Sequence, residues 1–233
     1  MSYDKRYSGR KFDEMRPIEA KIGVIKRADG SALFKIGETI AIAAVYGPRE
    51  LHPRFLQNPE TGILRCNYDM ISFSVPERKR PGPSRRSVEI SLVTEKALLP
   101  VLDLKQFPNA VIDVFIQIIQ ANSGTRCAGI SAASLALANA GIPMKDLVSS
   151  VSVGKVGNKI LIDLDKEEED HEEATDIPIA ITNRTKQITL LQLDGNINKK
   201  ELLEALKLAK LGCEKIAKIQ EKTLKDYYKN EHE

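Results

Sequence analysis

The chain has no tryptophan and only three cysteines, Cys66, Cys127 and Cys213, which lie far apart in its 233 residues. Their odd number and wide spacing exclude a disulfide scaffold, and the lack of paired Cys and His ligands excludes structural zinc. No apolar run approaches the ~20 residues of a membrane span. The amino terminus also lacks the apolar stretch of a signal peptide. These absences predict a cytoplasmic protein with no membrane association.

Charge is nearly balanced, with 35 basic and 32 acidic side chains giving a net charge of +3. The distribution is uneven, because basic residues gather at 78–86 and acidic residues gather at 163–173. A basic patch with a separate acidic cluster fits an enzyme that binds a polyanion. A solvated loop and a solvated acidic turn would give the same pattern, so charge alone leaves both readings open.

Hydrophobic periodicity and turn residues predict a chain of alternating strand and helix groups, long enough for one large domain or two small ones. Strands are predicted at 21–25, 31–36, 39–46, 67–75, 110–120, 148–153, 159–164, 176–182 and 187–193, and helices at 84–99, 127–140 and 198–229. This order indicates an α+β or α/β fold with mixed sheets and packed helices. Gly141 and Pro143 mark the best internal boundary.

The segment Ser123-Gly124-Thr125-Arg126 opens a helix directly after an apolar strand. A helix amino terminus offers unpaired N–H groups and partial positive charge, and glycine lets an anion approach the backbone. Threonine adds a hydroxyl donor and arginine a fork that matches phosphate. The motif is therefore a candidate phosphate site, although Ser or Thr before a helix is more often only a cap. It is not a P-loop, because no GK[ST] follows.

Two aspartates, Asp170 and Asp176, flank the step from the acidic segment into the apolar strand 176–182. Neighbouring carboxylates can hold Mg²⁺, or one of them can stay protonated and act as a general acid. A solvated turn is the usual explanation for an acidic run, and it would account for Asp170. Asp176 is harder to explain in that way, because its charge begins an apolar strand.

Cations at 85–86 lie where a helix begins, which opposes the helix dipole. A bound phosphate would explain the positions of Arg85 and Arg86, and a nearby protein carboxylate would explain them equally well. Tyr68 follows Arg65 on a predicted strand, so it could stack on a base while the arginine contacts the backbone. Packing in the core or at a sheet edge is the more common role of such a tyrosine.

These pieces together resemble the RNase PH family, and most closely the catalytic RNase PH-type subunit of the archaeal exosome. The matching stretches, in order, are 9–18 (GRKFDEMRPI), 85–90 (RRSVEI), 123–126 (SGTR), 132–143 (AASLALANAGIP) and 169–176 (EDHEEATD). Several independent matches in the same order are more specific than any one of them. The resemblance implies an α+β RNase PH fold of two similar halves, each a mixed sheet with helices. The expected division is an arm at 1–16, a first half at 17–145 and a second half at 146–233.

The resemblance also implies phosphorolysis, in which inorganic phosphate attacks the 3′-terminal phosphodiester of single-stranded RNA and releases a nucleoside diphosphate. The reaction is reversible, so such enzymes also add 3′ tails. Implied partners are a related inactive RNase PH-type subunit, which completes a hexameric ring of three heterodimers, and RNA-binding cap subunits. The implied roles are phosphate binding by Gly124, Thr125, Arg126 and Arg86, RNA binding by Arg85, Arg86, Tyr68, Arg65 and Arg54, and catalysis with shared Mg²⁺ binding by Asp170 and Asp176.

One departure concerns the metal, because polynucleotide phosphorylase has a lysine shortly after its second aspartate and this chain has Ile177-Pro178-Ile179 there. Two alternatives keep the fold. A homohexameric RNase PH would trim tRNA 3′ ends with the same chemistry. A non-catalytic RNA-binding ring subunit would have lost the acidic pair, and the presence of Asp170 and Asp176 argues against it.

Overall fold

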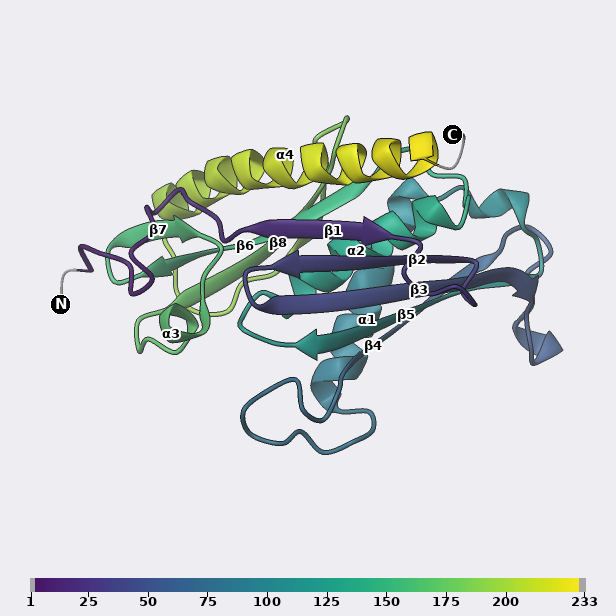
Figure 1. Ribbon diagram of the computed structural model, residues 1–233, viewed down its shortest axis with the longest axis horizontal. Coiled ribbons are helices and arrows are strands. Elements are labelled where there is room, and N and C mark those ends of the chain that lie inside the picture. Colours follow the sequence, from purple (N-terminus) through teal and green to yellow (C-terminus); the bar gives the residue numbers. More distant parts are fainter. Residues whose placement is uncertain (1–2, 231–233) are drawn as a thin grey trace.

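The computed structural model describes residues 3–230, which form two β-sheets with helices packed between and over them (Figure 1). The first sheet has the order β1-β2-β3-β5-β4 and the second has the order β7-β6-β8-β9. The strands are β1 Ile18–Ile22, β2 Gly30–Ile36, β3 Thr39–Glu50, β4 Ile63–Met70, β5 Ala110–Gln120, β6 Val148–Val156, β7 Lys159–Ile162, β8 Thr175–Thr182 and β9 Ile188–Leu191. The helices are α1 Arg85–Leu98, α2 Thr125–Asn139, α3 Lys166–Glu169 and α4 Lys199–Asn230. Residues 1–2 of the predicted arm and 231–233 of the predicted second half lie outside the described residues.

The predicted α+β class is confirmed, and so is the pairing of most strands. Strands β1, β2 and β3 form an antiparallel meander, and β5 pairs antiparallel with β3 but parallel with β4. The first sheet is therefore mixed, as expected. The second sheet was also expected to be mixed, but it is antiparallel throughout, because β6 pairs in this way with both β7 and β8, and β9 with β8.

Element boundaries depart from the sequence prediction where backbone conformation or capping decides them. Strand β1 ends at Ile22 because Gly23 has a left-handed φ of +69° and lies against the ring of Tyr227. Strand β4 begins at residue 63, and residues 71–75 leave the sheet. Helix α3 was predicted as an acidic turn. It forms because the Asp165 side chain accepts a hydrogen bond from the Glu168 backbone N–H, which caps the first turn.

Helix α2 is the centre of the core, since it packs against β2 and β3 of the first sheet and against β6 of the second. Its alanines, serines and Gly129 let both sheets approach closely. The closeness is greatest at Gly30, where an added Cβ would lie 2.3 Å from the backbone nitrogen of Ala140. One helix therefore fixes the position of the second sheet relative to the first.

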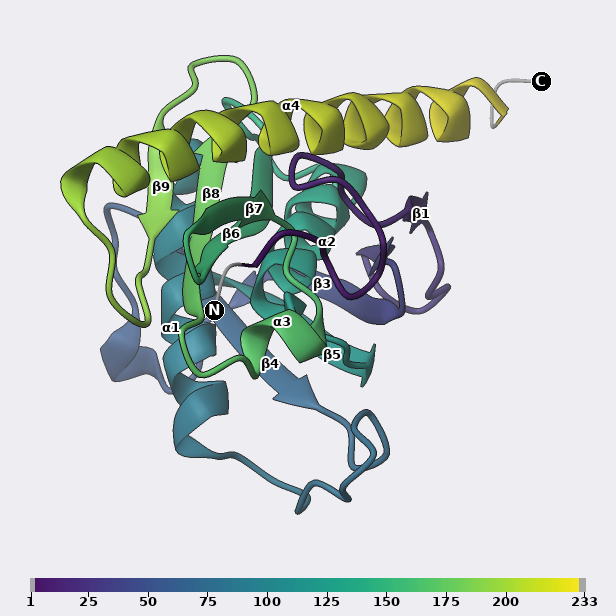
Figure 2. The same ribbon diagram turned by 90° about the vertical axis from the view of Figure 1, so that its left-hand side faces the viewer.

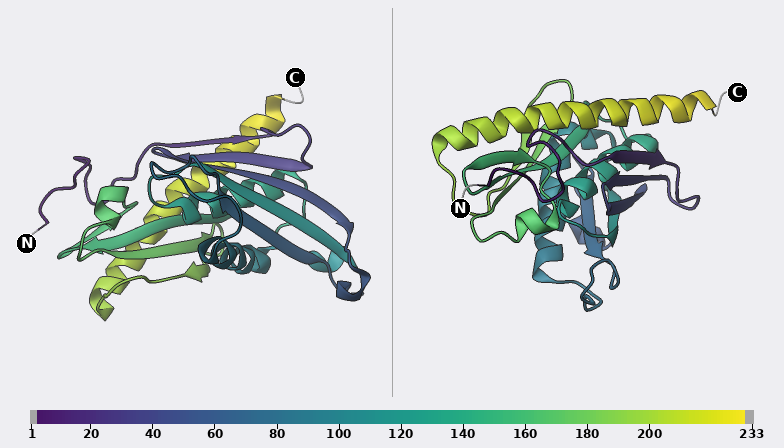
Figure 3. Two further views of the ribbon diagram at one scale, coloured as in Figure 1. Left: turned by 90° about the horizontal axis from the view of Figure 1, so that it is seen from below. Right: turned by 60° about the vertical axis from the view of Figure 1, so that its left-hand side comes forward.

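The other long helices cover the outside of this core. Helix α4 lies along β6 and β7 and reaches β1, so it spans both sheets (Figures 2 and 3). Helix α1 packs on β4 and α2 and also touches β9. Within residues 3–230, none of the helices combines the length and apolar character needed to cross a membrane.

The amino-terminal segment 3–16 has no regular structure but is not a free arm. It lies beside β7 and α3 (Figure 1), and the side chains of Tyr3, Arg6 and Arg16 are buried there. Tyr3 packs with Val156, Leu161 and other apolar residues in a small second core. The first residues of the chain are thereby attached to the second sheet before the chain enters the first.

Candidate active site

A cavity of about 370 Å³ lies where the amino termini of α1 and α2 meet the second sheet. Its walls come from segments that are far apart in the sequence: the starts of both helices, strands β6 and β8, helix α3 and the chain after β9. The lining residues are Arg86, Glu89, Gly124, Thr125, Arg126, Cys127, Ser152, Glu169, Asp176, Pro178, Gln192, Leu193 and Asp194. Of the residues predicted from sequence, the cavity brings together Arg86, Gly124, Thr125, Arg126 and Asp176.

Gly124 precedes α2 with a left-handed φ of +66° and has no side chain that could cap the helix. The first N–H groups of α2 therefore keep their capacity to bind an anion in the cavity. Thr125 adds a hydroxyl, whose oxygen accepts a 2.9 Å hydrogen bond from Tyr68 Oη. Because that oxygen is already an acceptor for Tyr68, the Thr125 hydroxyl hydrogen is left to donate to a ligand.

The Arg126 guanidinium is held in place by two polar neighbours. Its Nη1 donates a 2.6 Å hydrogen bond to Gln192 Oε1, and its Nη2 lies 3.6 Å from Glu89 Oε1. Gln192 Nε2 in turn donates to the same Glu89 oxygen at 2.9 Å. Arg126 Nε is buried and has no hydrogen-bond partner within residues 3–230. A donor in this condition fits an oxyanion such as phosphate, whose oxygens can accept from the planar guanidinium fork.

Arg86 reaches the cavity from the first turn of α1, which contains no acidic residue. Ser84 caps that helix and forms a reciprocal pair of hydrogen bonds with Ser87. The cap leaves two adjacent cations, Arg85 and Arg86, at the positive end of the helix dipole. An anion in the cavity would relieve that unfavourable arrangement.

Asp176, the second residue of β8, lines the same cavity, and its carboxylate accepts a short hydrogen bond from Ser152 Oγ. Burial raises the pKa of Asp176, and the negative charges of Glu169 and Asp194 act in the same direction. The Ser152 hydrogen bond and Arg126 oppose these effects without overcoming them. Asp176 is therefore the carboxyl group in the cavity with a raised pKa, which suits a proton donor.

Glu169 and Asp194 were not found by the sequence analysis, although both line the cavity. Asp194 is placed there by a reciprocal pair of 2.9 Å backbone hydrogen bonds with Asp176. Glu169 is the last residue of α3. The sequence signals for Glu169 were its membership of the acidic run and of the matching stretch 169–176, whereas Asp194 followed a predicted strand without any motif.

Two predicted site residues do not face the cavity. The Asp170 side chain is 60% exposed and forms an ion pair with Lys166, one turn earlier in the chain. The expected pairing of Asp170 with Asp176 is absent from this structure, and Glu169 takes the position beside Asp176. Tyr68 is only 2% exposed, so its ring cannot stack on a base. Its role here is to orient Thr125 through the hydroxyl.

The remaining predicted arginines lie outside the cavity. Arg65 forms a salt bridge with Asp113 on the neighbouring strand β5, with Nε 2.5 Å from Oδ1. Arg54 belongs to a short 3₁₀ turn, Arg54–Leu56, and its Nε lies 3.7 Å from Glu50 Oε1. Arg85 is exposed beside Arg86 at the start of α1. None of the three lines the cavity.

The carboxylates that line the cavity could bind a metal ion only as part of an open site. Within residues 3–230, nowhere do three or more His, Cys, Asp or Glu side chains gather as a metal-binding group. A closed protein cage is therefore not present in that range. Mg²⁺ commonly takes only one or two carboxylates and completes its shell with water and substrate phosphates. Asp176 and Glu169 fit that kind of site.

Residues 14–143 match the description "3′ exoribonuclease family, domain 1", and residues 146–212 match the description of domain 2 of that family. The chain is 55% identical over 224 residues to "Exosome complex component Rrp41" of Thermococcus kodakarensis, which covers 96% of this chain and 90% of that protein. The protein of the same name from Pyrococcus furiosus is 54% identical over 224 residues, with 96% and 89% covered. The one from Methanopyrus kandleri is 51% identical over 223 residues, with 96% and 93% covered.

Solved structures agree with this assignment. A chain of the Archaeoglobus fulgidus exosome with RNA bound to the active site superposes with a TM-score of 0.79 at 26% identity, covering 91% of both chains. Rice Rrp46 superposes with a TM-score of 0.85 at 22% identity, covering 94% of this chain and all of the other, which supports the fold alone. Both family domains and identities above 50% along nearly the whole sequence lead to one conclusion: this chain belongs to the 3′ exoribonuclease family.

Proposed function

We propose that this chain is the catalytic subunit of an RNA exosome and degrades single-stranded RNA from the 3′ end by phosphorolysis. One observation carries the proposal: the amino terminus of α2, with Arg126, faces the buried carboxyl of Asp176 across a single cavity. The first group suits a bound phosphate and the second suits a proton donor. Relatives named as exosome components and a neighbour with RNA in its active site support the RNA substrate.

In the proposed reaction, inorganic phosphate lies at the start of α2, where the backbone N–H groups, Thr125 and Arg126 hold its oxygens. Arg86 binds the 3′-terminal phosphodiester. A phosphate oxygen attacks the phosphorus of that diester, the new P–O–P bond forms, and the bond to the 3′ oxygen of the preceding nucleotide breaks. The products are a nucleoside diphosphate and RNA shortened by one residue. Such a displacement needs positioning and charge neutralisation, with little covalent work by the protein.

The leaving 3′ oxygen takes a proton, and Asp176 is the proposed donor. Burial and the neighbouring carboxylates raise its pKa, which favours the protonated form, and Ser152 fixes the orientation of its carboxyl. In the reverse direction, the deprotonated carboxylate would accept the proton of the 3′ hydroxyl as a tail is added. Burial is the main cause of the raised pKa of Asp176, and the charge of the Glu169 carboxylate adds to it.

We also propose Mg²⁺ as the cofactor, held by Glu169 and the substrate phosphates, with Asp176 adding to them only in its deprotonated form. When bound, the ion would supply neutralisation of the charge that develops on the phosphoryl oxygens.

RNA would reach the cavity along a larger groove of about 1200 Å³ that shares Arg86, Thr125 and Glu169 with it. The segment between β4 and α1 lines this groove with Arg78, whose charge suits the RNA backbone, and with Lys79, whose ammonium is paired with Asp69. Arg86 lies where the groove meets the cavity, and it is proposed to hold the 3′-terminal phosphates together with Arg85, the exposed residue before it. Arg54 and Arg65 are proposed as outer contacts.

We propose that the active assembly is a hexameric ring of three heterodimers with a related inactive RNase PH-type subunit, bound by RNA-binding cap subunits in the cytoplasm. Exposed apolar side chains support an assembled state. Phe115 is 40% exposed on the first sheet, and Ile188 and Leu191 are each 44% exposed on the edge strand β9. A neighbouring subunit would cover such groups.

The test is degradation of a single-stranded RNA oligomer with Mg²⁺, with and without inorganic phosphate. The full chain is assayed alone and then mixed with an RNase PH-type partner from the same source. Asp176→Asn is the inactive control, and Asp226→Asn, an exposed change on α4, is the matched control. Phosphate-dependent release of nucleoside diphosphates, increased by the partner, is the expected result.

The alternative functions differ in the product released or in the need for phosphate or a partner subunit. Release of monophosphates without added phosphate would mean hydrolysis and would overturn the mechanism. Full activity of a homohexamer without any partner would identify a homohexameric RNase PH instead. Loss of all activity in every mixture, with RNA binding retained, would indicate a non-catalytic ring subunit.

A further inference from the structure

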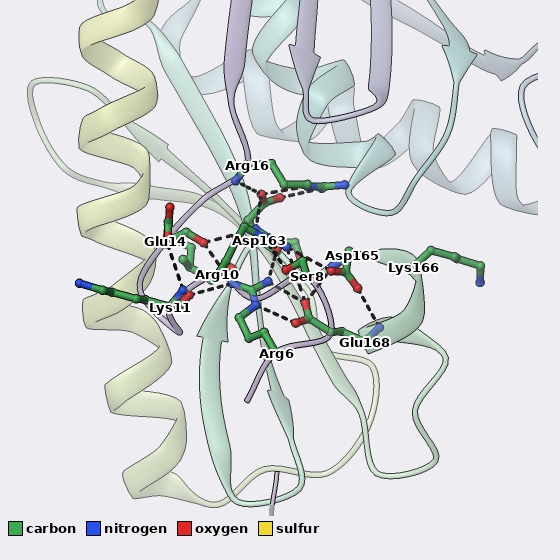
Figure 4. Close-up of polar contacts among 12 residues, drawn as sticks. Arg6, Ser8, Arg10, Lys11, Glu14, Arg16, Asp163, Asp165, Lys166 and Glu168 are labelled. Carbon is green, nitrogen blue, oxygen red and sulfur yellow. Dashed lines mark hydrogen bonds and ion pairs between the residues drawn. The ribbon is translucent and has the colours of Figure 1, made fainter. Parts of the chain in front are cut away.

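Arg16 is a buried side chain of the segment 3–16. It does not line the cavity, but it joins the loop before α2 to the chain after β7. Its Nε and Nη2 donate to the two carboxylate oxygens of Asp163 at 2.9 and 2.7 Å, as Figure 4 shows. Its Nη1 donates a short hydrogen bond to the backbone carbonyl of Asn122. One guanidinium therefore links the chain after β7 to the chain before α2.

The link to Asn122 acts on the phosphate-binding loop itself. Ser123 and Gly124 both have left-handed φ values, +57° and +66°. For Ser123, which is not glycine, this conformation costs about 1 kcal/mol and has to be held by neighbours. An added Cβ on Gly124 would lie 3.3 Å from Arg16 Nη2, so the guanidinium is directly behind the loop. Thr39 Oγ1 supports the loop from the other side by donating to the Ser123 carbonyl at 2.7 Å.

The link to Asp163 acts on the acidic segment that carries Glu169 into the cavity. Asp163 also has a left-handed φ, +55°, and its side chain is almost fully buried. The following residues are held by two more arginines of the same segment (Figure 4). Arg6 Nη2 lies 2.6 Å from Glu168 Oε2, and Arg10 Nη2 lies 3.3 Å from Asp165 Oδ2. Glu169 follows Glu168 directly, so its position depends on this anchor.

We infer that Arg16 is a positioning residue for phosphate binding, because it holds the loop 122–124 and the acidic segment 163–169 in one fixed relation. This inference rests on the proposed function and adds to it a group outside the cavity. A second contact, from the Lys166 backbone N–H to Asn122 Oδ1 at 3.1 Å, runs between the same two segments. Arg16 differs from that contact because its single rigid, planar guanidinium bonds both Asn122 and Asp163.

The experiment measures binding of inorganic phosphate to the full chain by titration calorimetry, with Kd for a single-stranded RNA oligomer measured in parallel. The variants are Arg16→Lys and Arg16→Gln, and the matched control is Arg27→Lys, an exposed arginine in the turn between β1 and β2. Lysine retains a charge for Asp163 but has no fork that reaches Asn122 at the same time. Arg16→Gln leaves the buried Asp163 with fewer partners and should lower Tm.

Arg16→Lys is expected to retain nearly the Tm of the wild type and its Kd for RNA, while its Kd for phosphate rises about tenfold, a change of about 1.4 kcal/mol. If Arg16 were purely structural, its replacement would lower Tm but would not raise the Kd for phosphate more than the Kd for RNA. Unchanged phosphate binding in Arg16→Lys would overturn the inference, and so would equal weakening of phosphate and RNA. Failure of the wild type to bind phosphate would overturn the proposed function itself, and the inference with it.

Discussion

Replacing Asp176 by asparagine should make the protein more stable and nearly inactive at the same time. Asparagine has the same shape, and its Oδ1 can still accept from Ser152 Oγ. What it removes is the charge, and that charge is unfavourable in the folded state because the carboxyl is buried beside Glu169 and Asp194. It also removes the proton that the leaving 3′ oxygen would take.

The sign of the stability change follows from the raised pKa. Between the ordinary pKa of an aspartate and the raised pKa of Asp176, the folded state binds more protons than the unfolded state, so wild-type stability falls as pH rises through this window. Asp176→Asn does not titrate, and its Tm advantage should appear in that window and persist above it. Activity should fall about 10²- to 10⁴-fold, the usual contribution of a general acid, which corresponds to about 2.7–5.4 kcal/mol.

The assays are thermal unfolding of the full chain from pH 4 to pH 8 and phosphorolysis of an RNA oligomer at saturating phosphate. Wild-type activity in the degradative direction should decline as pH rises past the raised pKa, and the residual activity of Asp176→Asn should lack this limb. RNA affinity should be unchanged, since Arg85 and Arg86 remain. A Tm lower than that of the wild type at pH 8, or retained activity, would refute the reasoning. Asp226→Asn should change neither property.

Three further changes test other parts of the structure. Tyr68→Phe removes only the hydroxyl that orients Thr125, so thermal unfolding should show a loss of about 1 kcal/mol, or about 2–4 °C in Tm. Gly30→Ala places a methyl group 2.3 Å from the backbone at the end of α2, and urea unfolding should show a loss of about 3 kcal/mol. Glu169→Gln removes a charge that raises the pKa of Asp176, so the alkaline limb of the pH–rate profile should move to lower pH, whereas Asp170→Asn should leave it in place.

Most regular elements could be predicted from the sequence, because their patterns are local. The β-branched run 110–120 became β5 with the same ends, and the Ala- and Ser-rich stretch before Gly141 became α2. The amphipathic pattern after residue 198 became α4. Errors came at ends that depend on distant contacts. Strand β1, for example, stops at Gly23, where the ring of Tyr227 from the far end of the chain packs.

The predicted site residues lie together in the cavity where a helix start determines their position, and they are scattered elsewhere. The N–H groups of α2 and the side chains of Thr125 and Arg126 follow directly from a strand, a glycine and a helix. Tyr68 could not be placed in the same way, because inward and outward positions alternate along a strand and a single tyrosine fits either. The structure places it on the inner face of β4, where it contacts Thr125.

The sequence could not show which of Glu169 and Asp170 faces the cavity, because contacts with the segment 3–16 decide it. Consecutive helical residues point about 100° apart, so the choice of which carboxylate faces the cavity is decided by how the one-turn helix α3 is rotated. That rotation is fixed by Glu168, which is fully buried against Arg6 from the start of the chain. A charged segment such as 3–16 would ordinarily be solvated, yet three of its arginines bind carboxylates of residues 163–168. The orientation of the acidic wall of the site therefore depends on a contact spanning some 160 residues, and no local pattern could have revealed it.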